Sequence, residues 1–162
     1  MSAHHQLSIS VGIIERIEKL LEVKHMEYKE NALYYEDYCK LRESVEWLPY
    51  SKEQTQKALD NSIYTVIAVD NNHTIGMGRL IGDGVYYLIA DIVVHPNYQK
   101  QGVGNKIVNM IIEYVENATP IGGRSSIQLI AVKGKEAFYE KMGFKIIPHE
   151  FCGSGMRKVI HK

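Results

Sequence analysis

The chain has 162 residues, of which 45% are hydrophobic and 23% are charged, and these are ordinary values for a globular protein. This length favours one domain with a core large enough to be stable without disulfides. Nineteen basic and nineteen acidic side chains cancel. The overall charge therefore gives no sign of a nucleic-acid or membrane surface, and we expect neither as a partner.

The cysteines and the N-terminus indicate the compartment. Cys39 and Cys152 are too few and too far apart for a disulfide framework, and no Cys/His pair has the spacing of metal ligands. No apolar run approaches the length of a membrane span, and the N-terminus lacks a basic region followed by an apolar core. We expect a cytoplasmic protein without a metal site.

Residues 1–25 are predicted to be an N-terminal extension that contains an amphipathic helix. Apolar residues recur there at helical spacing, from Ile13 to Leu21, with charged residues between them. The extension either docks on the domain, makes contacts in a homodimer, or results from the choice of start site. The domain itself is expected to span residues 26–162.

The first half of this domain is predicted to contain a short strand, then two helices, and then three further strands. A short strand over 26–30 precedes a helix that Asn31 caps and that ends near Pro49. Ser51 to Gln54 has the capping-box pattern and begins a helix that reaches about residue 61. Turn-rich segments then separate three apolar, β-branched runs. These runs predict strands over 63–69, 75–81 and 85–94.

The second half predicts an alternation of helices and strands. A helix over 103–116 precedes a loop with proline and glycine, and a strand over 126–132 follows. Because a helix separates this strand from 85–94, the two are expected to be parallel neighbours. A helix over 135–142 ends at Gly143, and two late strands cover 144–147 and 156–160. The fold class is therefore α/β, of the α+β type, with a mixed, mostly antiparallel central sheet flanked by helices.

A glycine-rich turn lies between the strand that ends in Val94 and the helix that begins at Val103. Glycines at 102 and 104 let a ligand approach the backbone, and the first N–H groups of the helix have no partner inside it. These groups favour an anion, most simply a phosphate. The P-loop pattern is excluded because Asn105 and Lys106 follow the last glycine, and the dinucleotide fingerprint is excluded because a third glycine is missing.

Two motifs together resemble the GNAT superfamily of acetyl-CoA-dependent N-acetyltransferases. The first is Gln-x-x-Gly-x-Gly from Gln99 to Gly104, and the second is Phe-Tyr-x-x-x-Gly-Phe from Phe138 to Phe144. The resemblance covers residues 26–160 and implies the GNAT fold, with a parallel pair of strands that splays apart at the cofactor site. The chain departs from the family where an asparagine often precedes the second motif, since it has Lys133-Gly134-Lys135 there.

The resemblance also implies the cofactor, acetyl-CoA, and the residues that bind it. The cradle for its pyrophosphate would be Gln99, Lys100, Gln101, Gly102, Val103, Gly104 and Asn105. The backbone of Ile92, Val93 and Val94 would bind the cofactor arm. Tyr139 would face the cofactor sulfur and give a proton to the departing thiolate.

The implied reaction transfers an acetyl group directly to a primary amine of a small molecule, without a covalent enzyme intermediate. Such an amine is mostly protonated at pH 7, so its proton must be removed. Asp91 interrupts an apolar strand and is either the base or a structural carboxylate with a partner. Trp47 and Tyr87 are the candidate walls of the acceptor site, since aromatic faces suit amines.

Two other functions stay open on the same fold. One is an acetyltransferase that acts on a protein or peptide, at its N-terminus or at a lysine. The other is a regulator that binds acetyl-CoA and does not catalyse. An open groove would favour the first, and the presence of Tyr139 and Asp91 argues mildly against the second.

Overall fold

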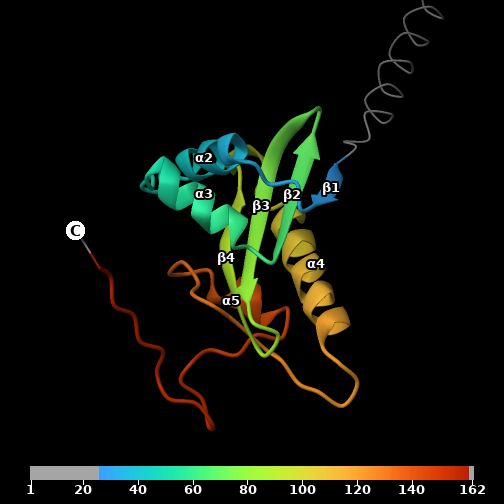
Figure 1. The fold of residues 1–162 in the computed structure, drawn as a ribbon, viewed down its shortest axis with the longest axis vertical. Coiled ribbons are helices and arrows are strands. Elements are labelled where there is room, and N and C mark those ends of the chain that lie inside the picture. The colour runs from blue at the N-terminus through green and yellow to red at the C-terminus, as the bar shows by residue number, and fades with distance from the viewer. Residues whose placement is uncertain (1–25, 161–162) are drawn as a thin grey trace, which may run out of the picture.

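The computed structural model describes residues 26–160, which form a five-stranded sheet with helices on both faces (Figure 1). The strands lie in the order β1-β2-β3-β4-β5; β4 and β5 run parallel, and the other neighbours are antiparallel. This arrangement confirms the predicted mixed, mostly antiparallel sheet. The predicted helix of the N-terminal extension lies outside the described residues.

The five strands fall close to the predicted ranges. They are β1 (Glu27–Glu30), β2 (Tyr64–Asp70), β3 (His73–Gly82), β4 (Tyr86–Val94) and β5 (Ser126–Leu129). Every residue of β2 is buried because both faces of the sheet are covered there, which explains its almost continuous apolar sequence. The β2–β3 hairpin turns through two asparagines with positive φ, a conformation that asparagine tolerates.

Helix α4 (Val103–Ala118) covers one face of the sheet. Its buried residues recur at helical spacing, and Ile107 and Ile111 among them are completely covered. Glycine in β3 allows the close approach: a β-carbon on Gly78 would lie 2.5 Å from Cγ2 of Ile107 and 2.9 Å from Cδ1 of Ile111. The close packing of Ile107 and Ile111 on the sheet therefore depends on the absence of a side chain at Gly78.

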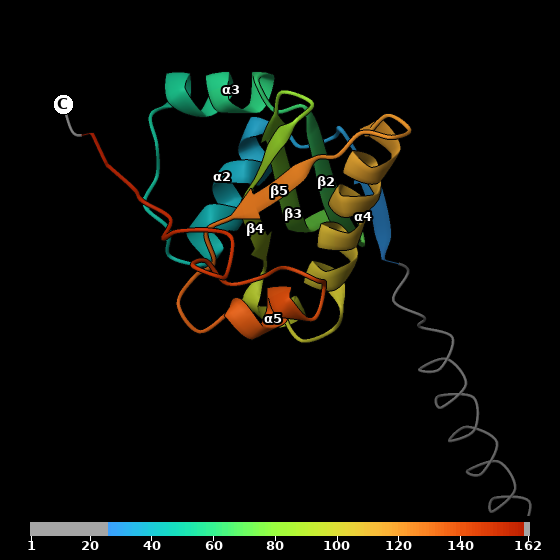
Figure 2. The same cartoon turned by 90° about the horizontal axis from the view of Figure 1, so that it is seen from below.

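Helices α2 (Tyr35–Ser44) and α3 (Lys52–Asp60) lie on the opposite side of the sheet from α4 (Figure 2). The predicted capping box of α3 is confirmed, with the Ser51 hydroxyl accepting a hydrogen bond from the Gln54 N–H. The predicted cap of α2 is wrong, because Tyr34 is the capping residue. Asn31 instead has positive φ, and its side chain accepts a hydrogen bond from the Thr65 N–H, which ties the chain to β2.

Strand β4 contains a bulge in its second half. Met77 pairs with Val93 and Arg79 pairs with Ala90, so Gly78 alone lies opposite two residues, Asp91 and Ile92. Asp91 has φ of 54°. The extra residue reverses the alternation of side chains along the strand. As a result Ile92 packs in the core under α4, while Asp91 and Val93 face α2.

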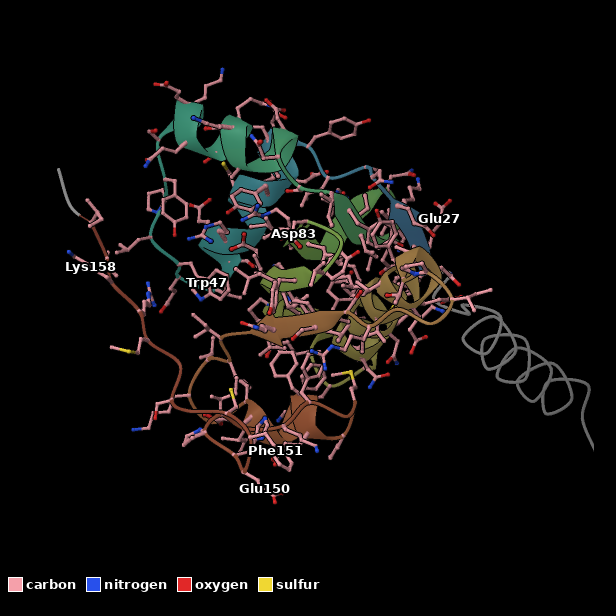
Figure 3. All side chains as sticks on the ribbon, turned by 60° about the horizontal axis from the view of Figure 1, so that its bottom comes forward. Glu27, Trp47, Asp83, Glu150, Phe151 and Lys158 are labelled. Carbon is pink, nitrogen blue, oxygen red and sulfur yellow. The ribbon has the colours of Figure 1, made fainter. Side chains whose placement is uncertain are left out.

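The C-terminal part differs most from the prediction. Helix α5 (Glu136–Glu140) forms but is shorter than predicted. The two predicted late strands are wrong: residues 144–147 and 156–160 lie outside the sheet, and only an isolated bridge joins His149 to Cys152. The segment runs away from the sheet past Phe151 and Lys158 (Figure 3). Strand propensity depends on a partner and a face to pack on, and these short runs have neither here.

Candidate active site

The parallel pair of strands separates in the middle of β4. The ladder between β4 and β5 runs from Tyr86↔Ser126 to Ile89↔Leu129 and ends there. Strand β4 continues to Val94 and is paired with β3 on its other edge. The edge of β4 from Asp91 to Val94 that faces away from β3 therefore has no strand beside it among residues 26–160. This confirms the predicted splay and leaves backbone groups available to a ligand.

The glycine-rich turn places the start of α4 next to this open edge. Gly102 caps α4 with φ of 85°, and Lys100 also has positive φ. The first bond within the helix runs from the Lys106 N–H to the Gly102 carbonyl. The N–H groups at positions 103 to 105 therefore have no acceptor inside the helix and carry the positive end of its dipole. This geometry suits an anionic group.

Two glutamines hold the turn in shape. The side-chain amide of Gln99 donates to the Val94 carbonyl at 3.0 Å, and that of Gln101 donates to the Asn97 carbonyl at 2.8 Å. Tyr98 donates to the Asp70 carboxylate at 2.9 Å, which ties the turn to β2. Sequence reasoning predicted that both glutamines contact a cofactor. In the structure their side chains fix the backbone of the turn.

The second motif packs against the first. A β-carbon on Gly104 would lie 3.5 Å from Cζ of Phe138 and 3.5 Å from Cγ2 of Val94. The start of α4, the end of β4 and helix α5 therefore meet at one point. Tyr139 lies beside this point, with its ring edge-on to Phe138 at 4.9 Å and to Phe144 at 5.9 Å between ring centroids.

Tyr139 is half-buried, and this burial raises the pKa of its hydroxyl above the usual 10.0. The hydroxyl thus keeps its proton throughout the physiological range. A neutral phenol that keeps its proton can donate a hydrogen bond, and in the transfer step a proton, to a thiolate that forms next to it. A protonated hydroxyl group therefore lies beside the meeting point of the two motifs.

Asp91 has strong partners on the other face of the sheet. Arg42 Nη1 lies 2.8 Å from Asp91 Oδ1, and Arg79 contacts Oδ2 through Nε at 3.0 Å and Nη2 at 2.9 Å. The Tyr38 hydroxyl also donates to Oδ2, at 3.2 Å. All three charged side chains are about nine-tenths buried. Both carboxylate oxygens are therefore occupied by cationic or neutral donors.

The two arginines connect Asp91 to the helices on that face. Arg79 Nη1 donates to the Ala58 carbonyl and the Ser62 hydroxyl at the end of α3. Arg42 Nη2 donates to the Leu48 carbonyl in the loop that follows α2. One carboxylate on the bulge of β4 thus organises both helices and the loop between them.

The two candidate acceptor residues lie on different faces. Trp47 lies beside α2 (Figure 3), with its ring 5.0 Å from the Arg42 guanidinium carbon. Tyr50 flanks the same guanidinium at 4.7 Å. Tyr87 is 4% exposed and belongs to the core under α4. The structure therefore does not bring Trp47 and Tyr87 together, because the sheet separates them.

Sequence reasoning missed Tyr38, Arg42 and Arg79, and the sequence contains a signal for two of them. Arg79 interrupts an apolar strand in the same way as Asp91, and opposite charges in neighbouring apolar strands indicate a buried pair. Arg42 follows Tyr38 by one helical turn on the buried side of α2. Only the three-dimensional fold shows that both arginines share one carboxylate.

Other kinds of site are not found in residues 26–160. No three His, Cys, Asp or Glu side chains within this range come close enough together to hold a metal ion. None of the helices of this part of the chain has the length and apolar character that a bilayer crossing requires.

Comparison with known proteins agrees with this geometry. The model of the acetyltransferase (GNAT) domain matches residues 27–160, and the chain belongs to this family. The crystal structure of a Staphylococcus aureus protein of unknown function, described as a probable acetyltransferase, is 32% identical. It has a TM-score of 0.72 and matches over 82% of this chain and 99% of that one.

Two further relatives support the same family. A GNAT-family acetyltransferase from Streptococcus pneumoniae is 26% identical, with a TM-score of 0.70 over 85% of this chain and 99% of that one. The uncharacterized N-acetyltransferase ycf52 of Pyropia yezoensis is 29% identical over 109 residues, which are 64% of this chain. The match spans 60% of the length of that relative.

Proposed function

We propose that this protein is an N-acetyltransferase that moves an acetyl group from acetyl-CoA directly to a primary amine of a small molecule. The observation that carries the proposal is the meeting of three elements at Gly104: the first turn of α4, the unpaired end of β4 and the phenyl ring of Phe138. Family membership supports the same reaction class.

The residues present fit acetyl-CoA. The N–H groups of Val103, Gly104 and Asn105, together with the turn from Gln99 to Gly102, would hold its pyrophosphate, because they present donors at the positive end of a helix. The open edge formed by Ile92, Val93 and Val94 would hold its extended arm. An extended ligand can form hydrogen bonds with the backbone of a strand edge that no other strand occupies. When bound, the cofactor supplies a thioester that an amine can attack.

Tyr139 acts in the proposal as the general acid. Its neutral hydroxyl donates a proton to the sulfur that leaves, and burial keeps this proton in place until the thiolate forms. The backbone N–H groups at the bulge of β4 provide fixed dipoles for the oxyanion that develops on the carbonyl. No side chain needs to be acetylated, so the transfer is direct.

The acceptor is expected on the face of the sheet that carries α2 and α3. The loop from Val45 to Tyr50 contributes Trp47 and Tyr50 there, and Tyr50 is 57% exposed. Asp91 lies at this face but has both oxygens engaged by arginines and Tyr38. These contacts favour the structural role that the sequence left open for Asp91 over the role of a free base.

A panel of acceptors tests the proposal. The full chain would be incubated with acetyl-CoA and, in turn, glucosamine, spermidine, kanamycin, tyramine and a lysine-containing peptide, and free thiol would be measured. We expect turnover with at least one of the small amines. Turnover on the peptide alone would indicate a protein acetyltransferase. Binding of CoA by calorimetry without turnover on any amine would indicate a non-catalytic regulator.

A further inference from the structure

Two positively charged side chains and one negatively charged side chain meet at the bulge of β4. Arg42 and Arg79 share the single carboxylate of Asp91, and we call these three residues the arginine clamp. Each of its side chains is about nine-tenths buried. The clamp therefore holds a net charge of plus one away from bulk water, where charges interact over longer distances than at the surface.

The surroundings of the clamp supply no second anion. From α2 the neighbouring titratable group is Tyr38, whose burial raises its pKa to about 12, so it stays neutral. From α3 and the residues after it come the Ala58 carbonyl and the Ser62 hydroxyl. The loop after α2 adds the Leu48 carbonyl and aromatic rings. Within residues 26–160, the hydrogen-bond partners of the two guanidinium groups are thus neutral, apart from Asp91.

One guanidinium atom also lacks a partner. Arg42 Nε is buried and has no hydrogen-bond acceptor, although Nη1 and Nη2 of the same side chain are both bonded. A buried N–H without an acceptor is costly. The rings of Tyr38, Trp47 and Tyr50 lie 5.5, 5.0 and 4.7 Å from the guanidinium carbon, but they carry no net charge, so the clamp keeps its excess of positive charge.

The clamp lies next to the segment that the proposed function assigns to the thioester. Asp91 is the bulged residue, and Ile92 directly follows it at the start of the unpaired edge of β4. Because Asp91 and Ile92 are consecutive in the chain, an acceptor amine bound at Ile92 from the side of α2 would lie near the clamp. A protonated amine is repelled there, while a neutral amine is not.

Resting on the proposed function, we propose that the arginine clamp favours the neutral, nucleophilic form of the bound acceptor amine by its excess positive charge. Arg42 and Arg79 then act through space on the amine, and Asp91 positions them. In the transfer step the amine nitrogen forms a bond to the acetyl carbon, the carbon–sulfur bond breaks, and the sulfur leaves with the electron pair. The proton that the amine loses before attack goes to water. The nitrogen loses a second proton after attack, and this proton returns through water to Tyr139, which has given its own to the departing sulfur.

The proposal predicts opposite effects of two neutralising substitutions on the acid limb of the pH–rate profile. Arg42→Gln removes a positive charge, so the bound amine holds its proton more tightly and the limb moves to higher pH. Asp91→Asn removes the negative charge, so the limb moves to lower pH. Each shift is expected to be on the order of one pH unit. Arg42→Lys keeps the charge and should leave the limb in place.

The measurement uses the amine that the wild-type protein acetylates fastest in the panel, with kcat recorded from pH 5 to 10. Arg124→Gln, in the exposed loop before β5, is the matched control and should leave the profile unchanged. Tyr38→Phe removes a hydrogen bond to Asp91 without changing charge, and it also should not move the limb. Circular dichroism checks that each variant is folded.

Calorimetry gives a second readout that does not depend on turnover. Binding of the same amine to the protein saturated with CoA is measured about half a pH unit below the pKa of the free amine, in two buffers with different ionisation enthalpies, which gives the number of protons released. For a pKa shift of about one unit we expect about half a proton for the wild type and Arg42→Lys, and close to none for Arg42→Gln. If Arg42→Gln does not fold, Asp91→Asn and Arg42→Lys still test the sign of the effect.

Three outcomes would overturn the inference. Equal proton release in the wild type and Arg42→Gln would show that the clamp does not act on the amine. So would shifts of the same sign in Arg42→Gln and Asp91→Asn. Loss of turnover at every pH in a folded Asp91→Asn would identify Asp91 as the base instead. Each of these results leaves acetyl transfer by the wild type intact, so the proposed function is judged separately by the panel.

Discussion

The phenyl ring of Phe138 lies 3.5 Å from the place that a β-carbon on Gly104 would occupy. This contact joins the two sequence motifs, which are more than thirty residues apart in the chain. Helix α5 therefore forms one wall beside the start of α4, and Val94 of β4 forms another at the same distance.

Gly104→Leu should weaken the binding of CoA. A single β-carbon would make ordinary contacts with Phe138 and Val94, but the larger side chain must displace one of them and distort the first turn of α4. We expect the dissociation constant measured by calorimetry to rise about tenfold, which corresponds to about 1.4 kcal/mol. Gly104→Ala is the matched control and should bind nearly as well as the wild type. Unaltered affinity in a folded Gly104→Leu would rule out the cradle.

Tyr139→Phe should lower kcat by about 10²-fold and leave the affinity for CoA unchanged, because only a proton donor is lost. The pKa of Tyr139 is raised above 10.0 by burial, so the hydroxyl is protonated at every pH below this value. The ratio of wild-type to variant kcat should therefore stay constant from pH 7 to 9. Weaker CoA binding with undiminished turnover would refute the role of Tyr139 as the acid.

Gly78→Ala should destabilise the packing of α4 on the sheet. Its β-carbon would lie 2.5 Å from Ile107 and 2.9 Å from both Ile111 and Ile92, so α4 would have to shift. We expect the free energy of unfolding in urea to fall by about 1–3 kcal/mol. Gly153→Ala, where a β-carbon meets nothing within 4 Å, is the control. Equal stability of the two variants would contradict the close packing of α4 on β3.

Trp47→Ala should weaken binding of the acceptor amine, whereas Tyr87→Ala should lower the stability of the fold. Trp47 is partly exposed beside α2, so its loss should raise the KM for the acceptor amine several-fold and leave CoA binding intact. Tyr87 is buried under α4, so its loss should cost about 3–5 kcal/mol of stability, measured by denaturant unfolding. An unchanged KM in Trp47→Ala would remove this residue from the acceptor site.

Much of the sheet and of the cofactor side could be predicted because the signals there are local. Apolar runs, asparagine turns and the capping box of Ser51 each act over a few residues, and the five strands of the sheet and α3 formed close to their predicted ranges. The glycine turn and the Phe-Tyr motif are also short. The family resemblance that they carry together implied that the second motif packs beside the site of the first.

The acceptor side could not be predicted in the same way, because its contacts join distant segments. The partners of Asp91 are 12 residues away at Arg79 and 49 residues away at Arg42. Trp47 and Tyr87 were both predicted as acceptor-site residues, but they lie on opposite faces of the sheet, and a strand pattern alone does not tell which face a residue occupies. The late strands failed for a related reason, since their ranges have strand composition but no neighbour to pair with.

The bulge in β4 lets a single strand serve two purposes. The half from Tyr86 to Ile89 pairs with β5 and contributes Tyr87 and Ile89 to the core. The half from Asp91 to Val94, which follows the extra residue opposite Gly78, has one edge whose backbone pairs with no strand and is open to a ligand. Deleting Asp91 would let Ile92 alone lie opposite Gly78, with Ile92 still under α4 and Val93 still facing α2. The strand would remain regular, but Arg42 and Arg79 would lose the carboxylate that they share, so the extra residue is the source of the buried ionic cluster.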